Sequence, residues 1–260
     1  MTGLERTARP LARDWDQIAD QIKSSRRVVI FLDFDGTLVN IAPRPDQVRL
    51  APVTRRVLRR LARHPRVTIV VISGRRRAEL LRHVGLRGIR YFGLYGWERG
   101  HRSPLPASAL IALRRVCSEL STHLSAFRGV WMENKRFSLS VHFLGVTPRV
   151  EHRARRKLRS LLGPFQDILH LIENFRDAEI VPRDISGKGT TVQEFLAKPP
   201  HRHALPFYFG DDLSDEPAFE AVHTGVTIRV GTSRPTRARY SIPSPAALAS
   251  VLARLEASLR

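Results

Sequence analysis

Residues 28–38 read Val-Val-Ile-Phe-Leu-Asp-Phe-Asp-Gly-Thr-Leu, an apolar run that ends in two carboxylates. A run of this kind, rich in β-branched residues and closed by glycine, is typical of a strand buried on both faces of a sheet. In open α/β sheets, ligands bind just beyond the carboxyl ends of the strands. Asp33 and Asp35 therefore stand where one can act as nucleophile and metal ligand and the other as proton donor. The alternative is a strand followed by an ordinary acidic turn, of which Asp-Gly alone is typical.

Two later apolar runs are expected to bring polar residues to the same sheet edge. Residues 67–75 read VTIVVISGR and place the Ser73 hydroxyl at the end of an apolar run, and residues 207–216 read FYFGDDLSDE. The oxygens of these acidic residues suit Mg²⁺, and Lys188, in the segment SGKGT, can neutralise phosphate as a compact cation. Taken singly, each feature has an ordinary alternative: a helix N-cap serine, a solvated lysine, an acidic first helical turn.

The order of these motifs resembles that of the haloacid dehalogenase superfamily, whose members are mostly phosphohydrolases. The resemblance implies that Asp33 attacks phosphorus to form an aspartyl-phosphate. It implies that Asp35 protonates the leaving oxygen and later deprotonates the attacking water. Ser73 and Lys188 would clamp the phosphoryl oxygens and stabilise the developing charge.

The same resemblance implies a Mg²⁺ cofactor. The ion would be held by the Asp33 side chain, the Asp35 backbone carbonyl and Asp211. Asp212 and Asp215 would support its bound waters. Four more residues next to these motifs are expected to contact the substrate: Gly36, Thr37, Gly74 and Arg75.

Length and composition are those of a globular protein without membrane spans. The chain has 260 residues, 42% of them hydrophobic, which is enough for a large core and a second unit. No run of 18 or more apolar residues occurs, so no membrane partner is expected. The N-terminus has no apolar signal-peptide core, and the single cysteine, Cys117, cannot form an internal disulfide. A cytoplasmic location is therefore expected.

The net charge of +20 would attract anionic substrates. The basic residues are spread through the chain, and only five of the 44 are lysines. Many fall on the polar faces of expected helices, as in residues 54–63. We therefore expect a small-molecule substrate and no dedicated nucleic-acid partner. A polyanion-binding protein stays open as an alternative, and the sequence does not indicate an oligomeric state.

The order of expected elements predicts an α/β fold with an insertion. A Rossmann-like core with a parallel sheet would comprise residues 1–103 and 183–260. Residues 104–182 would form an inserted α/β cap domain with an antiparallel sheet and two helices, because residues 137–143 alternate strictly between apolar and polar. Helices are expected at 11–23, 52–63, 75–84, from 107, at 148–162, 188–197, 214–223 and from 245, and strands at 28–34, 67–72, 89–94, 137–143, 168–172, 178–181, 206–209 and 226–230.

Motifs within the insertion narrow the resemblance to one family. Glu133-Asn134-Lys135, with Ser138-Leu139 and His142, resembles the E-N-K-x-x-S-L-x-x-H motif of trehalose-6-phosphate phosphatases, and residues 179–189 and 210–219 resemble further motifs of that family. The resemblance implies hydrolysis of trehalose 6-phosphate to trehalose and phosphate, the last step of trehalose biosynthesis. It implies sugar contacts from four residues of the insertion: Glu133, Lys135, His142 and Glu179.

Three positions depart from the family pattern: Ser214 replaces the usual threonine, Val181 the usual arginine, and Tyr95-Gly96 the usual His-Gly. The substrate could therefore be another sugar phosphate, such as sucrose phosphate or mannosyl-3-phosphoglycerate. A catalytically inactive sensor of sugar phosphates is a further alternative, although intact Asp33 and Lys188 argue against it. Apart from the resemblance, Glu133 and Lys135 could equally be a surface ion pair at a turn.

Overall fold

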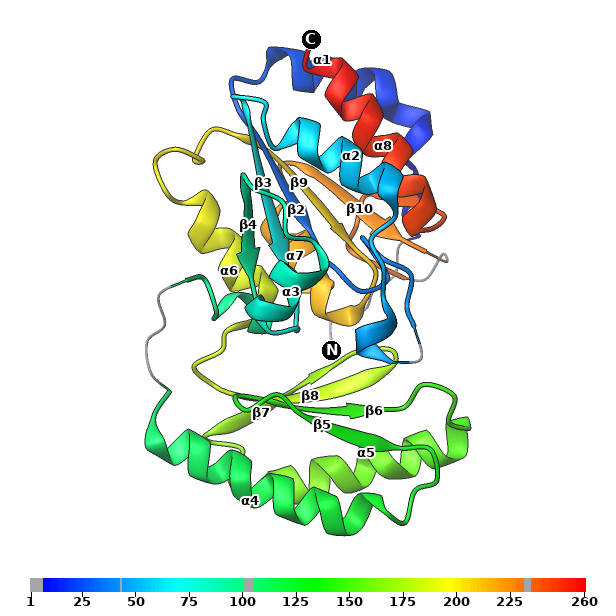
Figure 1. Ribbon diagram of the computed structural model, residues 1–260, viewed down its shortest axis with the longest axis vertical. Helices are drawn as coiled ribbons and strands as arrows, with labels where there is room; N and C mark the ends of the chain where they lie inside the picture. The colour runs from blue at the N-terminus through cyan, green and yellow to red at the C-terminus, as the bar shows by residue number, and fades with distance from the viewer. Residues whose placement is uncertain (1–6, 43, 101–104, 232–234) are drawn as a thin grey trace. The chain divides into compact units, whose positions relative to one another are not determined.

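The computed structural model describes residues 7–42, 44–100, 105–231 and 235–260 (Figure 1). The chain divides into two compact units, residues 1–100 with 186–260 and residues 101–185. The first predicted boundary, at 104, lies outside the described residues, and the second, at 182, precedes the observed one by three residues. The expected fold class is confirmed, because the first unit contains a parallel sheet and the second a separate antiparallel sheet.

The sheet of the first unit has seven parallel strands in the order β1-β11-β10-β9-β2-β3-β4. From β2 the chain proceeds to β3 and β4 on one side, whereas β9, β10 and β11 extend the sheet on the other. The boundary between β2 and β9 is therefore the topological switch point, where open α/β sheets bind their ligands. The strands are β1 (Arg9–Pro10), β2 (Val28–Leu32), β3 (Val67–Ile72), β4 (Ile89–Phe92), β9 (Leu205–Gly210), β10 (Val226–Val230) and β11 (Tyr240–Ile242).

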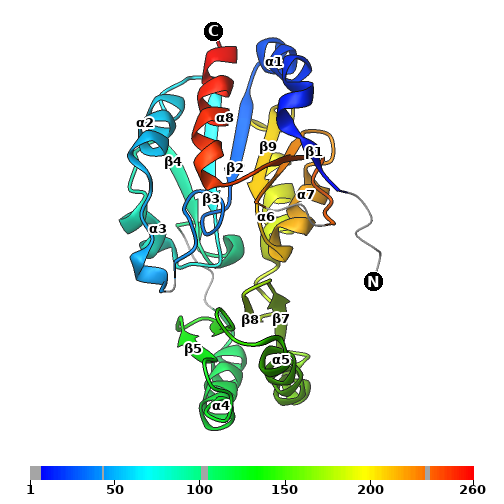
Figure 2. The same ribbon diagram turned by 90° about the vertical axis from the view of Figure 1, so that its right-hand side faces the viewer.

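Helices cover both faces of this sheet, which explains why its central strands are apolar throughout (Figure 2). On β2, Ile30 and Leu32 pack in the cluster formed with α1, α2, α3 and α8. Val29 and Phe31 point to the opposite face and pack with α6 and α7. The helices are α1 (Trp15–Ser24), α2 (Pro52–Leu61), α3 (Arg77–His83), α6 (Gly187–Leu196), α7 (Glu216–Ala221) and α8 (Pro245–Ser258), with 3₁₀ turns η1 (Leu11–Asp14), η2 (Pro45–Gln47), η3 (Leu94–Gly96) and η5 (Leu213–Asp215).

The second unit has its own hydrophobic core beneath a four-stranded antiparallel sheet in the order β5-β6-β8-β7. Alternate residues of the central strands, Leu139 and Val141 on β6 and Ile180 on β8, pack against helices α4 and α5. The opposite face of the sheet carries the polar residues of the same strands. The elements are α4 (Ala107–Leu124), β5 (Trp131–Asn134), β6 (Leu139–His142), α5 (Pro148–Leu162), η4 (Gly163–Phe165), β7 (Leu169–Glu173) and β8 (Asp177–Pro182).

Most differences from the expected elements concern short segments. The expected helix at 11–23 begins as the 3₁₀ turn η1, and α1 proper starts at Trp15. Strands β1 and β11, of two and three residues, are too short to display a hydrophobic period. Glu133, expected at a hairpin bend, lies inside the edge strand β5, which is largely solvent-facing and has no buried alternation.

Within the described residues, no helix combines the length and the apolar character needed to cross a bilayer.

The separate core of the second unit leads to a stability prediction. Leu158 of α5 is fully buried in that core, so Leu158→Ala should lower the free energy of unfolding of this unit by about 2–5 kcal/mol. Ile111→Ala, at a position of α4 that is 52% exposed, should change it by no more than about 0.5 kcal/mol. Urea denaturation followed by circular dichroism measures both, and equal losses would contradict the assigned core.

Candidate active site

A buried lysine joins two carboxylates at the carboxyl edge of the parallel sheet. Lys188 Nζ, on α6, donates to Asp33 Oδ1 and to Asp215 Oδ1, each at 2.7 Å. Burial lowers the pKa of Lys188, but the nearby carboxylates of Asp215 and Asp33 outweigh it, so the pKa is raised and the ammonium form is favoured. Asp33 directly follows β2, and its backbone N–H donates to the Phe209 carbonyl of β9 at 2.9 Å. The carboxylate therefore lies at the switch point.

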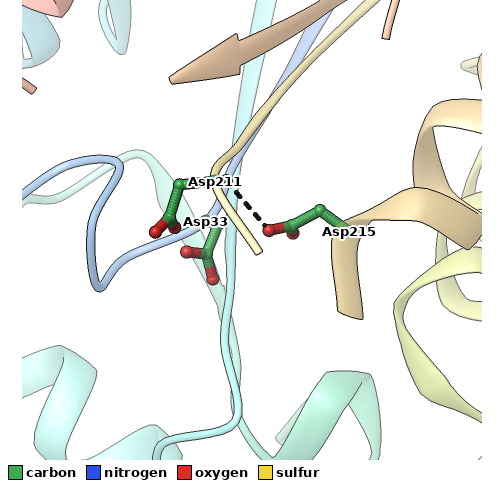
Figure 3. A group of neighbouring side chains, drawn as sticks. All are labelled: Asp33, Asp211 and Asp215. Carbon is green, nitrogen blue, oxygen red and sulfur yellow. Dashed lines mark hydrogen bonds between the residues drawn. The ribbon is translucent and has the colours of Figure 1, made fainter. Parts of the chain in front are cut away.

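Asp215 is fully occupied by hydrogen bonds within the protein. Its Oδ1 also accepts from the Tyr208 hydroxyl at 2.7 Å, and its Oδ2 accepts from the backbone N–H groups of Asp211 and Asp212 at 3.1 and 3.0 Å. Figure 3 shows the bond to Asp211. Asp215 thus connects Lys188 to the loop that follows β9. It orients the residues around it, and neither of its oxygens needs a further ligand.

Asp33 and Asp211 form the part of this acidic cluster that can hold a cation. Carboxylate oxygens of Asp33, Asp211 and Asp215 lie within 4.8 Å of one another (Figure 3), and Asp215 is already engaged. Burial raises the pKa of Asp33 to about 7, although the Lys188 ammonium lowers it. A bound cation would favour the ionised form. The donors are hard oxygens, so the set fits an ion such as Mg²⁺.

The loop after β2 is shaped around Asp211. Gly36 has φ +82°, and a Cβ built there would lie 2.0 Å from Asp211 Oδ2, so only glycine permits this approach. The Thr37 hydroxyl donates to Asp211 Oδ1 at 3.3 Å. From the other side, Arg229 of β10 donates to the Asp211 carbonyl at 2.8 Å and to the buried Glu216 at 3.2 Å. Both the backbone and the carboxylate of Asp211 are therefore held in place.

Asp212 lies outside the acidic cluster identified among the described residues. Its Oδ1 accepts from the Leu213 N–H at 2.7 Å, and with Asp215 it forms a capping box at the start of η5. The predicted role of Asp212 in supporting the waters of a metal ion stays a prediction.

The Asp35 carboxylate is held by Arg75, the last residue of the segment 67–75 that contains β3. Arg75 Nε and Nη2 donate to the two Asp35 oxygens at 2.6 and 2.7 Å, a bidentate pair. Arg75 Nη1 also donates to the Pro45 carbonyl at 2.8 Å, and the guanidinium lies 5.2 Å from the centroid of the Phe34 ring. Arg75 therefore connects the loop after β3, which carries it, to the loop after β2 and to the loop that contains η2.

A left-handed turn after β4 holds the backbone of Ser73 and Arg75 in place. Leu94 and Tyr95, both buried, have φ values of 47° and 57°, which is unusual for consecutive residues other than glycine. Their backbone N–H groups donate to the carbonyls of Arg75 at 2.8 Å and Ser73 at 2.9 Å. The Tyr95 carbonyl accepts from the Thr191 hydroxyl of α6 at 2.9 Å. The buried Ser73 is thus fixed relative to the helix that carries Lys188.

In the second unit, a buried carboxylate collects three donors on the polar face of the sheet. Glu179 of β8 accepts from Lys135 Nζ at 3.0 Å, from the Ser138 hydroxyl at 2.6 Å and from the Ser140 hydroxyl at 3.0 Å. Burial lowers the pKa of Lys135, but Glu179 and Glu133 outweigh it and raise that pKa to about 12. Lys135 and Glu179 therefore form a buried, hydrogen-bonded ion pair, so Lys135 is not simply an exposed partner of Glu133 at a turn.

Glu133 and His142 lie beside this pair and are more accessible. His142 Nε2 and Glu133 Oε2 are 3.2 Å apart, and the Glu133 side chain is 27% exposed. The His142 ring stacks on Trp131, with ring centroids 3.9 Å apart. The sequence did not single out Trp131; its place two residues before Glu133 in a strand is the signal that could have identified it.

The predicted residues thus fall into two groups, one in each unit. Two roles were not predicted. Arg229, itself bonded to Glu216, donates to the Asp211 carbonyl, and the Tyr208 hydroxyl donates to Asp215. The group in the first unit comprises Asp33, Asp35, Gly36, Thr37, Ser73, Gly74, Arg75, Lys188, Asp211 and Asp212, and the group in the second comprises Glu133, Lys135, His142 and Glu179.

Comparisons with known proteins agree with the motifs. The family model for trehalose-phosphatase matches residues 31–246. A trehalose-phosphate phosphatase of Mycobacterium tuberculosis strain H37Rv is 34% identical over 250 residues, which covers 91% of this chain and 63% of the relative. The chain therefore spans somewhat less than two thirds of the length of this curated relative.

Solved structures share the fold. The C-terminal domain of Candida albicans trehalose-6-phosphate phosphatase superposes with a TM-score of 0.81 at 20% identity, covering 97% of this chain and 98% of that one. Aspergillus fumigatus trehalose-6-phosphate phosphatase gives 0.67 at 21% identity, covering 96% and 99%. Because the family model spans most of the sequence and a curated relative exceeds 30% identity over nine tenths of it, this chain belongs to the trehalose-phosphatase family.

Proposed function

We propose that this chain is a Mg²⁺-dependent phosphomonoesterase that hydrolyses trehalose 6-phosphate to trehalose and phosphate, the last step of trehalose biosynthesis. The observation that carries the proposal is the Asp33–Lys188–Asp215 arrangement at the switch point, with Asp211 beside it. One oxygen of Asp33 is held by Lys188, and the other has no hydrogen-bond partner among the described residues. A carboxylate oriented in this way can act as a nucleophile.

In the proposed reaction, an Asp33 oxygen attacks phosphorus and the bond from phosphorus to the sugar oxygen breaks. The aspartyl-phosphate that forms is then hydrolysed by water, so one difficult step becomes two easier ones. Lys188 and Ser73 would bind phosphoryl oxygens and stabilise their charge. Asp33 and Asp211 would hold Mg²⁺, with the Asp35 carbonyl as a further ligand. When bound, the ion supplies positive charge that keeps Asp33 ionised and offsets the charge of the phosphate.

Asp35 would act as the acid and then the base. It would donate a proton to the departing sugar oxygen and later accept one from the attacking water. Because both of its oxygens are held by Arg75, at least one of these bonds must open before the carboxyl group can reach a substrate atom. Arg75 would therefore position Asp35 between turnovers, and Gly36, Thr37 and Gly74 would contact the phosphate through the loops that carry them.

The second unit would recognise the sugar. Glu133 and Lys135 offer an acceptor and a donor to sugar hydroxyls, and Glu179 orients Lys135 through its buried ion pair. His142 would complete the group through its bond to Glu133. The preference for trehalose 6-phosphate over other sugar phosphates is supported by the family of the chain and by the name of the mycobacterial relative. The cytoplasmic location stays a prediction.

The nucleophile gives the most direct test. Asp33→Asn keeps the size of the side chain but removes the attacking charge, so phosphate release from trehalose 6-phosphate should fall to near background. Asp16→Asn, at an exposed position of α1, should keep full activity. A colorimetric phosphate assay measures both, and substantial turnover by folded Asp33→Asn protein would remove Asp33 from its assigned role.

Metal dependence follows from the acidic cluster. Chelation by EDTA followed by dialysis should abolish activity, and added Mg²⁺ should restore it. Ca²⁺ should inhibit, because its larger and less regular coordination shell misplaces the reacting groups. Asp211→Asn should raise the Mg²⁺ concentration needed for half-maximal activity. Full activity after exhaustive chelation is the result that this proposal does not survive.

Sugar recognition can be separated from phosphate chemistry. Glu133→Ala, Lys135→Ala or Glu179→Ala should each lower kcat/KM for trehalose 6-phosphate. Each decrease should correspond to a loss of transition-state stabilisation of roughly 1–3 kcal/mol or more, because a polar partner is left unpaired. The loss on p-nitrophenyl phosphate, which has no sugar, should be much smaller. Steady-state kinetics on both substrates gives the comparison.

Glu151→Ala serves as the control for that series, because it breaks only a partly exposed ion pair on α5. Equal losses on both substrates would mean that Glu133, Lys135 and Glu179 serve folding or the chemical step instead. A full sugar-phosphate panel on the parent enzyme decides between trehalose 6-phosphate, sucrose phosphate and mannosyl-3-phosphoglycerate.

A further inference from the structure

Trp131 presents an open aromatic face on the polar side of the second unit's sheet. It lies on the edge strand β5 and is 38% exposed, whereas most large apolar side chains of this unit are buried. One face of the indole stacks on the His142 ring, with an interplanar angle of 14°. No other ring or cation contacts this indole among the described residues. The remaining ring surface is therefore available to a ligand.

The surroundings of this indole are polar and already ordered. Glu133 lies two residues further along β5, on the same face, and opposite Ser140 in the strand register. The hydrogen bond between Glu133 and His142 fixes both side chains beside the ring. The intervening residue, Met132, faces the other way and packs on the apolar core of the unit. The Trp131 side chain thus belongs to the polar face and contributes nothing to that core.

A flat aromatic surface beside a carboxylate matches the chemistry of a sugar ring. A pyranose has C–H groups on its faces and hydroxyl groups around its rim. The electron-rich face of an indole attracts the C–H groups, and fixed polar groups at its edge can bond the hydroxyls. A linear or acyclic phosphate ester offers only the charged group and gains nothing from the ring.

We propose that Trp131 is a specificity-determining residue, whose exposed face stacks on a pyranose ring of the substrate while Glu133 accepts hydrogen bonds from that ring's hydroxyls. The ligand class is a hexopyranose within a disaccharide phosphate. This inference rests on the proposed function and adds a residue outside the motif that begins at Glu133. His142 backs the indole and keeps its plane parallel to the sugar.

Kinetics on single variants tests the stacking. Trp131→Leu should raise KM for trehalose 6-phosphate about 3- to 10-fold, with kcat changed less than KM, and Trp131→Phe should recover most of the loss because it keeps a ring. Any loss on an acyclic phosphate ester such as glycerol 1-phosphate should be several-fold smaller, because that ester has no ring to stack on the indole. Ile111→Ala removes an exposed apolar side chain from α4 of the same unit and should leave both substrates unaffected.

A chemical readout separates stacking from a merely supporting role for Trp131. Oxidation of indoles by N-bromosuccinimide, located by peptide mass spectrometry, should be slowed several-fold at Trp131 by saturating trehalose. Trp97, also incompletely buried, is the internal control and should react at the same rate with and without the sugar. A Trp131 that only braces His142 would show no such protection.

The outcomes separate this inference from the proposed function. If the parent enzyme does not hydrolyse trehalose 6-phosphate, the proposed function fails, and protection of Trp131 by trehalose, sucrose or maltose then tests the stacking on Trp131 by itself. Absence of protection by every one of these sugars overturns the inference. If the parent enzyme is active but Trp131→Leu keeps its KM and trehalose gives no protection, only the inference is overturned.

Discussion

The buried bridge from Lys188 to Asp33 and Asp215 is the interaction on which the rest of the site depends. It joins the end of β2, the start of α6 and the turn η5, three segments that are far apart in the sequence. Removing the ammonium would leave two buried carboxylates facing each other without a cation, which is strongly unfavourable. The bridge therefore fixes the nucleophile and also limits how the three segments can move.

The positions of the charged residues follow from the sequence because parallel strands end at a common edge. Asp33, Ser73 and Asp211 each come directly after an apolar run, so their proximity follows from the βαβ pattern. The partner choices within the cluster do not follow in this way. That Asp215 accepts from Tyr208 while Asp35 pairs with Arg75 depends on side-chain directions set by tertiary packing.

In the second unit, the hydrophobic alternation of the sequence predicts one strand, β6, and misses another, β5. The strict alternation in β6 predicts a sheet with one wet face, and Leu139 and Val141 do pack on the helices. Strand β5 escaped prediction because an edge strand needs no apolar alternation when neither of its faces is fully covered. Its Trp131, stacked on a histidine of the neighbouring strand, is consequently visible only in three dimensions.

The left-handed turn at Leu94 and Tyr95 has a consequence for how sequence variation at this site should be interpreted. The backbone N–H and carbonyl of position 95 bond Ser73 and Thr191, so the conformation of this turn matters to the site. Histidine, the residue usual in the family, belongs to the few types that tolerate positive φ relatively well. Tyrosine here keeps the same conformation. A residue at this position must therefore tolerate the backbone shape, and a β-branched residue there would signal a rebuilt turn.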